Sequence, residues 1–398
     1  MYREIFRFNP EKMWRIAGQV IDYSLDIQAG DKLLIIYNPG ARQLVEMVGA
    51  QAAGKGAIVL TRSYDTSVLA AVFAAMDEGE NLEEKFETMI EPRWAEIKWA
   101  NKYLEIVSDD TPKAYEIVDR SLYSRFRKVY QKLQDYRVRE LAWNIISIPT
   151  SQEAEIDGEE YGQYIDTFLE ACDRNWSEVE KAQNTLVNIL RGGKRLEFFA
   201  DRGNPDKNWR TKLSMSIEGM VFGNETANLN FPGSEIFSAP VRGTVEGQLA
   251  LPYRVRFANR ILPNLRLVFK KGKVVEYSTD GDKQWVEKML NTDEGAREIG
   301  EIAFGTNPAF KKPYLNPMFV EKVGGSFHLA VGAAYPFKEY ASRPVRVDNG
   351  VRSALHEDLT RMMLPEYGGG EVILDGKTIQ KDGRFLDPQL EILNPKHK

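Results

Sequence analysis

The C-terminal half of the chain contains four short stretches in which acids or histidines stand among apolar and turn-forming residues. They read NFPGSEIFSAP, GEIAFGTNP, VEKVGGSFHLAVGAAY and SALHEDL. Their carboxylates and imidazoles are Glu235, Glu301, Glu321, His328, His356 and Asp358. The chain has only three histidines, and none precedes His328. This concentration makes the four stretches a candidate site.

The spacing of His356 and Asp358 suits a strand. Side chains two residues apart share one face of an extended segment, whereas on a helix they diverge by roughly 200°. His328 precedes the small, apolar run LAVGAAY, which is typical of a buried strand with a ligand at its mouth. We therefore expect both segments to be extended and to present these side chains to one cavity.

Four carboxylates and two imidazoles match a pair of divalent cations such as zinc, cobalt or manganese, which accept both histidine nitrogen and carboxylate oxygen. Two such ions, about 3.5–4 Å apart, need a negatively charged ligand set with a bridging carboxylate. The four acids balance four positive charges. The sequence therefore predicts a site for two divalent metal ions.

Taken in order, these motifs resemble those of the M29 metalloaminopeptidases, the thermophilic aminopeptidase T and aminopeptidase S group. The resemblance spans nearly the whole chain. VIDYSLDIQAGDKLLIIYN is similar to the opening segment of that family, IPTSQEAEIDGEEY to its mid-chain segment and GEVILDGKTIQKDGRF to its terminal hairpin. The resemblance implies a set of six metal ligands: Glu235, Glu301, Glu321, His328, His356 and Asp358.

The resemblance also implies an activity, the removal of N-terminal residues from peptides with a free amino terminus. Glu301 is the expected bridging carboxylate, and either Glu321 or Glu301 would move a proton from water to the leaving amine. Tyr335 stands where the family has an active-site tyrosine, which would donate to the tetrahedral oxyanion. The family further implies a homodimer that encloses the site.

Other functions remain open at the level of sequence. The chain could be a metal-free relative that serves as a binding or scaffold protein, or a metal-dependent amidase that acts on small molecules. A nucleotide-dependent enzyme would need a phosphate-binding loop. GAQAAGKG comes near that motif, but Gly56 replaces the required hydroxyl, and a helix C-cap explains the segment better.

Composition excludes several classes of partner. The net charge of −5 argues against nucleic acid and anionic lipid as partners. The longest apolar run, LAAVFAAM, is far shorter than the ~18 residues of a membrane span, and the N-terminus has no apolar signal core. A single cysteine excludes an internal disulfide framework. We expect a cytoplasmic protein.

The elements that position the site fall into two expected domains. Residues 1–192 alternate helical and strand-like segments, which predicts an α/β domain with a parallel sheet and flanking helices. Residues 193–398 predict a β-rich α+β catalytic domain. Two hairpins are expected there, with turns at Lys271-Gly272 and Asp375-Gly376. Only residues 282–302 have a strongly helical pattern in this half.

Overall fold

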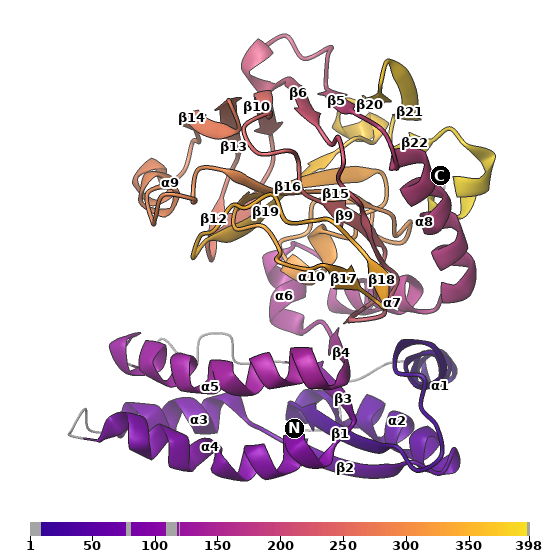
Figure 1. Cartoon of the computed structure of the whole chain (residues 1–398), viewed down its shortest axis with the longest axis vertical. Coiled ribbons are helices and arrows are strands. Elements are labelled where there is room, and N and C mark those ends of the chain that lie inside the picture. The colour runs from indigo at the N-terminus through magenta and orange to yellow at the C-terminus, as the bar shows by residue number, and fades with distance from the viewer. Residues whose placement is uncertain (1–8, 77–80, 109–117, 119, 396–398) are drawn as a thin grey trace. The chain divides into compact units, whose positions relative to one another are not determined.

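The computed structural model describes residues 9–76, 81–108, 118 and 120–395, and it divides into two compact units (Figure 1). The first unit extends to Asp173 and also contains Ala227–Pro232. The second contains Arg174–Thr226 and the chain from Gly233 onward. Within the described residues, no helix combines the length and apolar character that crossing a membrane requires.

A sheet of five parallel strands forms the centre of the first unit. Its strand order is β2 (Ile58–Ser63), β1 (Lys32–Tyr37), β3 (Lys102–Val107), β4 (Ala142–Ser147) and β8 (Asn230–Phe231). In β1, Leu33 and Ile35 are buried on one face while Leu34 and Ile36 are buried on the other. Both faces are therefore covered, and the predicted parallel sheet with flanking helices is confirmed.

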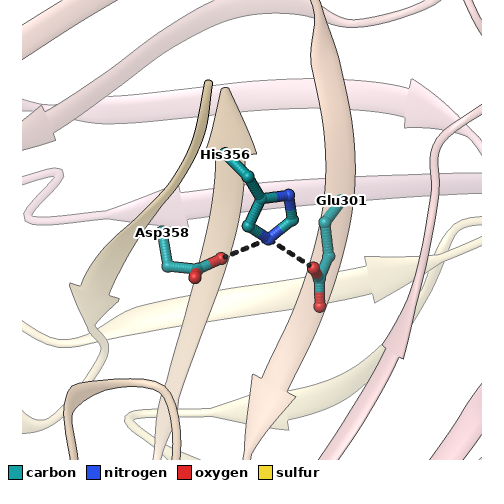
Figure 2. A group of neighbouring side chains, drawn as sticks. All are labelled: Glu301, His356 and Asp358. Carbon is teal, nitrogen blue, oxygen red and sulfur yellow. Dashed lines mark ion pairs between the residues drawn. The ribbon is translucent and has the colours of Figure 1, made fainter. Parts of the chain in front are cut away.

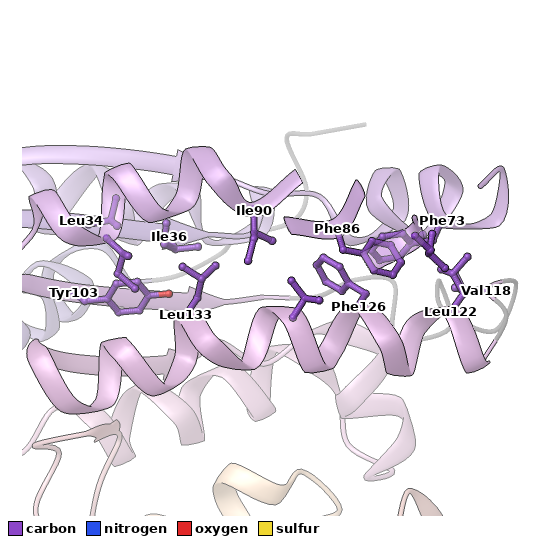
Figure 3. Close-up of a cluster of buried hydrophobic side chains, with 14 of the residues drawn as sticks. Leu34, Ile36, Phe73, Phe86, Ile90, Tyr103, Val118, Leu122, Phe126 and Leu133 are labelled. Carbon is purple, nitrogen blue, oxygen red and sulfur yellow. The ribbon is translucent and has the colours of Figure 1, made fainter. Parts of the chain in front are cut away.

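Helices of the first unit alternate with its strands. They are α1 (Pro10–Gln19), α2 (Arg42–Gly54), α3 (Thr66–Ala74), α4 (Leu82–Trp99), α5 (Arg120–Glu140), α6 (Ser151–Ile156) and α7 (Tyr161–Cys172). α2 ends at Gly54, and Gly56 follows with a positive φ, as expected of a helix C-cap. An aromatic cluster of Phe73, Phe86 and Phe126 joins α3, α4 and α5 (Figure 3).

The second unit contains a large antiparallel sheet with the order β14-β13-β10-β6-β5-β20-β21-β22. The strands are β5 (Arg195–Ala200), β6 (Thr211–Ser216), β10 (Glu246–Leu251), β13 (Leu265–Lys270), β14 (Lys273–Ser278), β20 (Gly370–Leu374), β21 (Lys377–Lys381) and β22 (Arg384–Phe385). The hairpins β13–β14 and β20–β21 turn at Lys271-Gly272 and Asp375-Gly376 with positive φ at both residues, so both predicted turns are confirmed.

A smaller antiparallel sheet of five strands lies against the large one. Its order is β19 (His356–Met362), β16 (Ser326–Gly332), β15 (Ile299–Gly305), β9 (Glu235–Ser238) and β7 (Gly223–Glu225). Phe304 and Phe327 are paired across β15 and β16, and both rings contact Phe198 of β5. One face of this sheet therefore faces the large sheet in the hydrophobic core, and the alternate residues face the other way.

Few helices accompany these sheets: α8 (Trp176–Leu190), α9 (Lys283–Leu290) and α10 (Pro317–Val320). The short strands β11 (Val255–Phe257) and β12 (Arg260–Leu262) form one ribbon, and β17 (Glu339–Tyr340) and β18 (Arg343–Pro344) form another. The helix predicted over residues 282–302 was wrong in its second part. It ends at Leu290, and Ile299–Gly305 is strand β15, because pairing with β9 and β16 on both sides outweighs the local helical pattern.

Candidate metal centre

The candidate ligands lie on one face of the smaller sheet, opposite the phenylalanine core. Directly paired residues of neighbouring strands point to the same face. Glu301 pairs with Ala330, Ala330 pairs with Asp358, and Gly332 pairs with His356. Strand β19 is extended, so His356 and Asp358 share this face as the sequence predicted.

The same register places His328 and Glu235 on this face. His328 of β16 pairs with Ala303, and Glu235 of β9 pairs with Gly305. Each candidate ligand on these strands thus has an alanine or a glycine as a neighbour across the ladder. Since the small partners fill little space, the ligand side chains can lie close to one another above the sheet. The donors come from four strands, β9, β15, β16 and β19.

Glu301, His356 and Asp358 form the tightest group, with one donor atom from each within 4.8 Å of the others. Figure 2 shows the Nε2 atom of His356 between the two carboxylates. It lies 3.3 Å from Glu301 Oε2 and 3.6 Å from Asp358 Oδ1. A β-bulge between Ile299 and Glu301 shifts the register just before this ligand. Bulges of this kind change the direction of a side chain next to a site.

His328 joins the group to Glu235. Its Nε2 atom lies 3.7 Å from Glu301 Oε1, 3.7 Å from Glu235 Oε2 and 3.9 Å from Asp358 Oδ1. Glu301 therefore faces both imidazoles, with one oxygen toward each. This is the arrangement that a bridging carboxylate would need.

Several atoms of the cluster fit a bound cation. His356 Nδ1 lies 2.7 Å from the carbonyl oxygen of Ala333, so a proton on Nδ1 donates to that oxygen and leaves Nε2 to face the carboxylates. The buried atoms His356 Nε2, Asp358 Oδ1 and Glu235 Oε2 form no hydrogen bond within the described residues. Buried polar atoms normally have a partner. Nitrogen and carboxylate oxygen together form the donor set that zinc and its neighbours accept.

The crowding of charge shifts the pKa values of the cluster. Burial raises the pKa of both Glu235 and Asp358, and the nearby Glu321 raises each further. Burial opposes protonation of the imidazoles, yet Glu301 raises the pKa of His328 to about 9 and that of His356 to about 10. Burial also opposes ionisation of Glu301, but the two imidazoles that face its oxygens lower its pKa to about 2. When no cation is bound, protons on the imidazoles and acids thus neutralise part of the negative charge of the cluster.

Glu321 lies at the edge of this cluster and contacts a residue that sequence reasoning missed. The Lys322 ammonium is fully buried, 3.1 Å from Glu321 Oε2 and 2.9 Å from Glu235 Oε1. It also lies 4.0 Å from Glu225 Oε2, a second buried acid that the sequence did not single out. Neither residue has an identifiable signal in the sequence: strand register places Glu225 at the site, and the turn after α10 places Lys322 there.

Tyr335 lies beside the cluster, as the prediction requires. Its ring centroid is 4.7 Å from that of His356, and it stacks on Phe337 with an interplanar angle of 4°. The residue as a whole is 36 % exposed. Burial of the hydroxyl and the charges of Glu301 and Asp358 raise the pKa of Tyr335, so the phenol keeps its proton at neutral pH.

A pocket of about 130 Å³ opens next to the ligands. His356, Asp358 and Glu321 form part of its wall, and Tyr253 and Tyr314 form another part. The volume is below the ~300–1,000 Å³ of pockets that bury drug-sized ligands. The pocket therefore has room for only one end of a ligand.

Comparisons with known proteins find relatives over nearly the whole chain. A family model described as thermophilic metalloprotease (M29) matches residues 9–366. Aminopeptidase AmpS of Bacillus subtilis is 22% identical over an alignment that covers 94% of this chain and 96% of that protein. Aminopeptidase T of Thermus thermophilus is 24% identical, with 96% of this chain and 97% of that protein covered.

The fold is also found among solved structures. Wild-type AmpT from Thermus thermophilus superposes with a TM-score of 0.72 at 21% sequence identity, covering 95% of this chain and 99% of that one. The parallel sheet and the β-rich region that follows it are therefore shared over nearly the entire length of both chains.

Proposed function

The chain belongs to the thermophilic metalloprotease (M29) family, and on that premise we propose that it is a metal-dependent aminopeptidase that removes N-terminal residues from peptides. The observation that carries the proposal is the group of Glu301, His356 and Asp358, whose donor atoms lie within 4.8 Å of one another beside a pocket. The names of the relatives in Bacillus and Thermus support the choice of aminopeptidase.

We assign the metal ligands as the sequence predicts. Glu301, His356 and Asp358 would hold one ion, and Glu235 and His328 would hold a second, with Glu301 bridging and Glu321 at the edge. The opposed oxygens of Glu301 support the bridging role. A divalent cation supplies Lewis acidity: when bound, it lowers the pKa of water to about 7 and polarises a carbonyl group. Zinc, cobalt and manganese all suit this donor set.

The side chains of the protein would perform the remaining steps. Both oxygens of Glu301 face imidazoles, so Glu321, which lines the pocket, is the better proton carrier of the two. Its carboxylate would accept a proton from water and deliver it to the leaving amine. The Tyr335 phenol, protonated at neutral pH, would donate a hydrogen bond to the oxyanion that develops on the scissile carbonyl.

The pocket supports a substrate bound by one end. A free α-amine close to the acids would be attracted by their negative charge, whereas an acylated amine would not. We therefore propose peptides with a free N-terminus as substrates. A homodimer is proposed from the family resemblance and a cytoplasmic location from the sequence, and sedimentation of the purified protein would test the oligomeric state.

The test is hydrolysis of a panel of amino-acid anilides by enzyme that has been stripped with a chelator and then restored with zinc, cobalt or manganese. We expect activity to disappear on stripping and to return with metal, and the N-acetylated anilides to remain uncut. Activity that ignores the chelator would refute a metal-dependent reaction. Equal cleavage of acetylated substrates would indicate a general amidase, and a stripped protein that recovers neither metal nor activity would indicate a non-catalytic relative.

A further inference from the structure

Two buried glutamates stand directly opposite each other at one end of the site. Glu225 of β7 pairs with Glu235 of β9. Both are buried. Like charges at directly opposite positions of a ladder destabilise a sheet. A buried charge is tolerated when a partner of opposite sign lies close to it. This end of the site therefore needs a positive charge even when no metal ion is bound.

Lys322 provides that charge. Its ammonium is fully buried and lies among three carboxylates, at 2.9 Å from Glu235, 3.1 Å from Glu321 and 4.0 Å from Glu225. The other end of the site has no such fixed cation within the described residues: Glu301 and Asp358 face only the two imidazoles among basic groups. The acids at one end of the site are thus neutralised by a lysine, whereas those at the other end face only imidazoles.

We propose that Lys322 makes the two ion positions unequal, so that one divalent cation is held tightly by Glu301, His356 and Asp358 while a second, at Glu235 and His328, is weak and exchangeable. The inference rests on the proposed metal-dependent function. The ammonium already neutralises part of the charge on Glu235, whose Oε1 it contacts, and it repels a dication bound by Oε2 of the same carboxylate. A metal ion at the tight position meets no comparable fixed charge.

The test is the metal content of purified protein, which does not depend on activity. Stripped protein is titrated with Zn²⁺ against a chromophoric chelator, and the ions that survive desalting are counted by mass spectrometry. We expect the natural chain to keep one ion and to bind the second only at higher free Zn²⁺. In Lys322→Met the second ion should bind on the order of 100-fold more tightly, so that two ions survive desalting.

Three further variants define the interpretation. Lys322→Arg keeps the charge and should retain one tight ion, and Lys270→Met, an exposed position on β13, should leave both affinities unchanged. Glu225→Gln removes one of the acids that Lys322 compensates, so the second ion should bind about tenfold more weakly while the tight ion is unaffected. This variant tests the inference even if Lys322→Met does not fold.

Two results would overturn the inference. One is a natural chain that retains two ions of equal affinity. The other is a folded Lys322→Met protein whose second ion binds no more tightly than before, which would reduce Lys322 to a support for its glutamates. A chain that binds no ion at either position would instead refute the proposed metal-dependent function.

Discussion

The affinity of the tight ion should rise with pH because His356 must lose a proton before it can bind a cation. Glu301 holds the pKa of His356 at about 10 when no metal is present. A pH of 7 therefore lies three units below the pKa of this imidazole. Displacing its proton then weakens metal binding by about a thousandfold, or about 4 kcal/mol. Each unit by which the pH rises between 7 and 9 should strengthen metal binding at least tenfold. Asp358, whose pKa is also raised, adds to this pH dependence.

The assay is competition for Co²⁺ with a chelator whose own pH dependence is known, combined with calorimetry in buffers of different ionisation enthalpy. We expect at least one proton released per tight ion at pH 7. His356→Ala should bind metal more weakly and should lose this proton release. An affinity that stays flat between pH 7 and 9 would refute the reasoning, since it would mean that His356 is neutral in the metal-free protein.

The same protonation links pH to the stability of the metal-free fold. A histidine whose pKa rises from 6.5 to about 10 on folding stabilises the fold fully below pH 6.5 and loses that effect as the pH rises toward 10. The Tm of stripped protein should therefore fall over this window, and saturating metal should reverse the trend, because the ion replaces the protons. A stripped protein whose Tm rises from pH 6.5 to 9 would contradict the sign of the shift.

Three other substitutions test separate parts of the structure. Ala330→Leu would place a larger side chain between Glu301 and Asp358, which pair with Ala330 from the two neighbouring strands, and should abolish metal retention with an unchanged circular dichroism spectrum. The exposed Ala354→Leu is the control, and retained metal in Ala330→Leu would argue against an ion between these two acids. Tyr335→Phe should lower kcat by about 10²–10³ at constant metal content, whereas a loss of metal would assign the ring a structural role. Phe86→Ala in the aromatic cluster of the first unit should lower the free energy of unfolding in urea by about 3–5 kcal/mol and leave the metal content in native buffer unchanged. A loss below about 1 kcal/mol would show that the cluster can collapse around the gap.

Local patterns in the sequence were sufficient for much of the fold. The apolar run LLIIYN predicts a strand, which β1 confirms, and the turn pairs Lys271-Gly272 and Asp375-Gly376 predict hairpins, because each depends on only a few adjacent residues. The helix expected to continue to residue 302 failed for the opposite reason. The strand around Glu301 exists because of its neighbours in the sheet, which lie far away in sequence.

The candidate site shows the same division. Histidines are rare in this chain, so composition alone indicated His328 and His356. Lys322 is one of many basic residues, and its importance depends on the pairing of Glu225 with Glu235, a register that no local pattern reveals. The alanines and glycines that pair with the candidate ligands could not be chosen from the sequence either, since small residues occur throughout it.

The connectivity of the two units limits how this protein could have been assembled or can be divided. The chain passes between the units at three places, after Asp173, after Thr226 and after Pro232. A single proteolytic nick at the first of these would leave the fragments joined, because strand β8 would still be hydrogen-bonded to β4. A gene fragment starting at Arg174 would encode β8 without the sheet it completes, with Glu235 only a few residues beyond. Replacement of residues 1–173 alone would therefore change four strands of the parallel sheet and leave the fifth, β8, from the original chain.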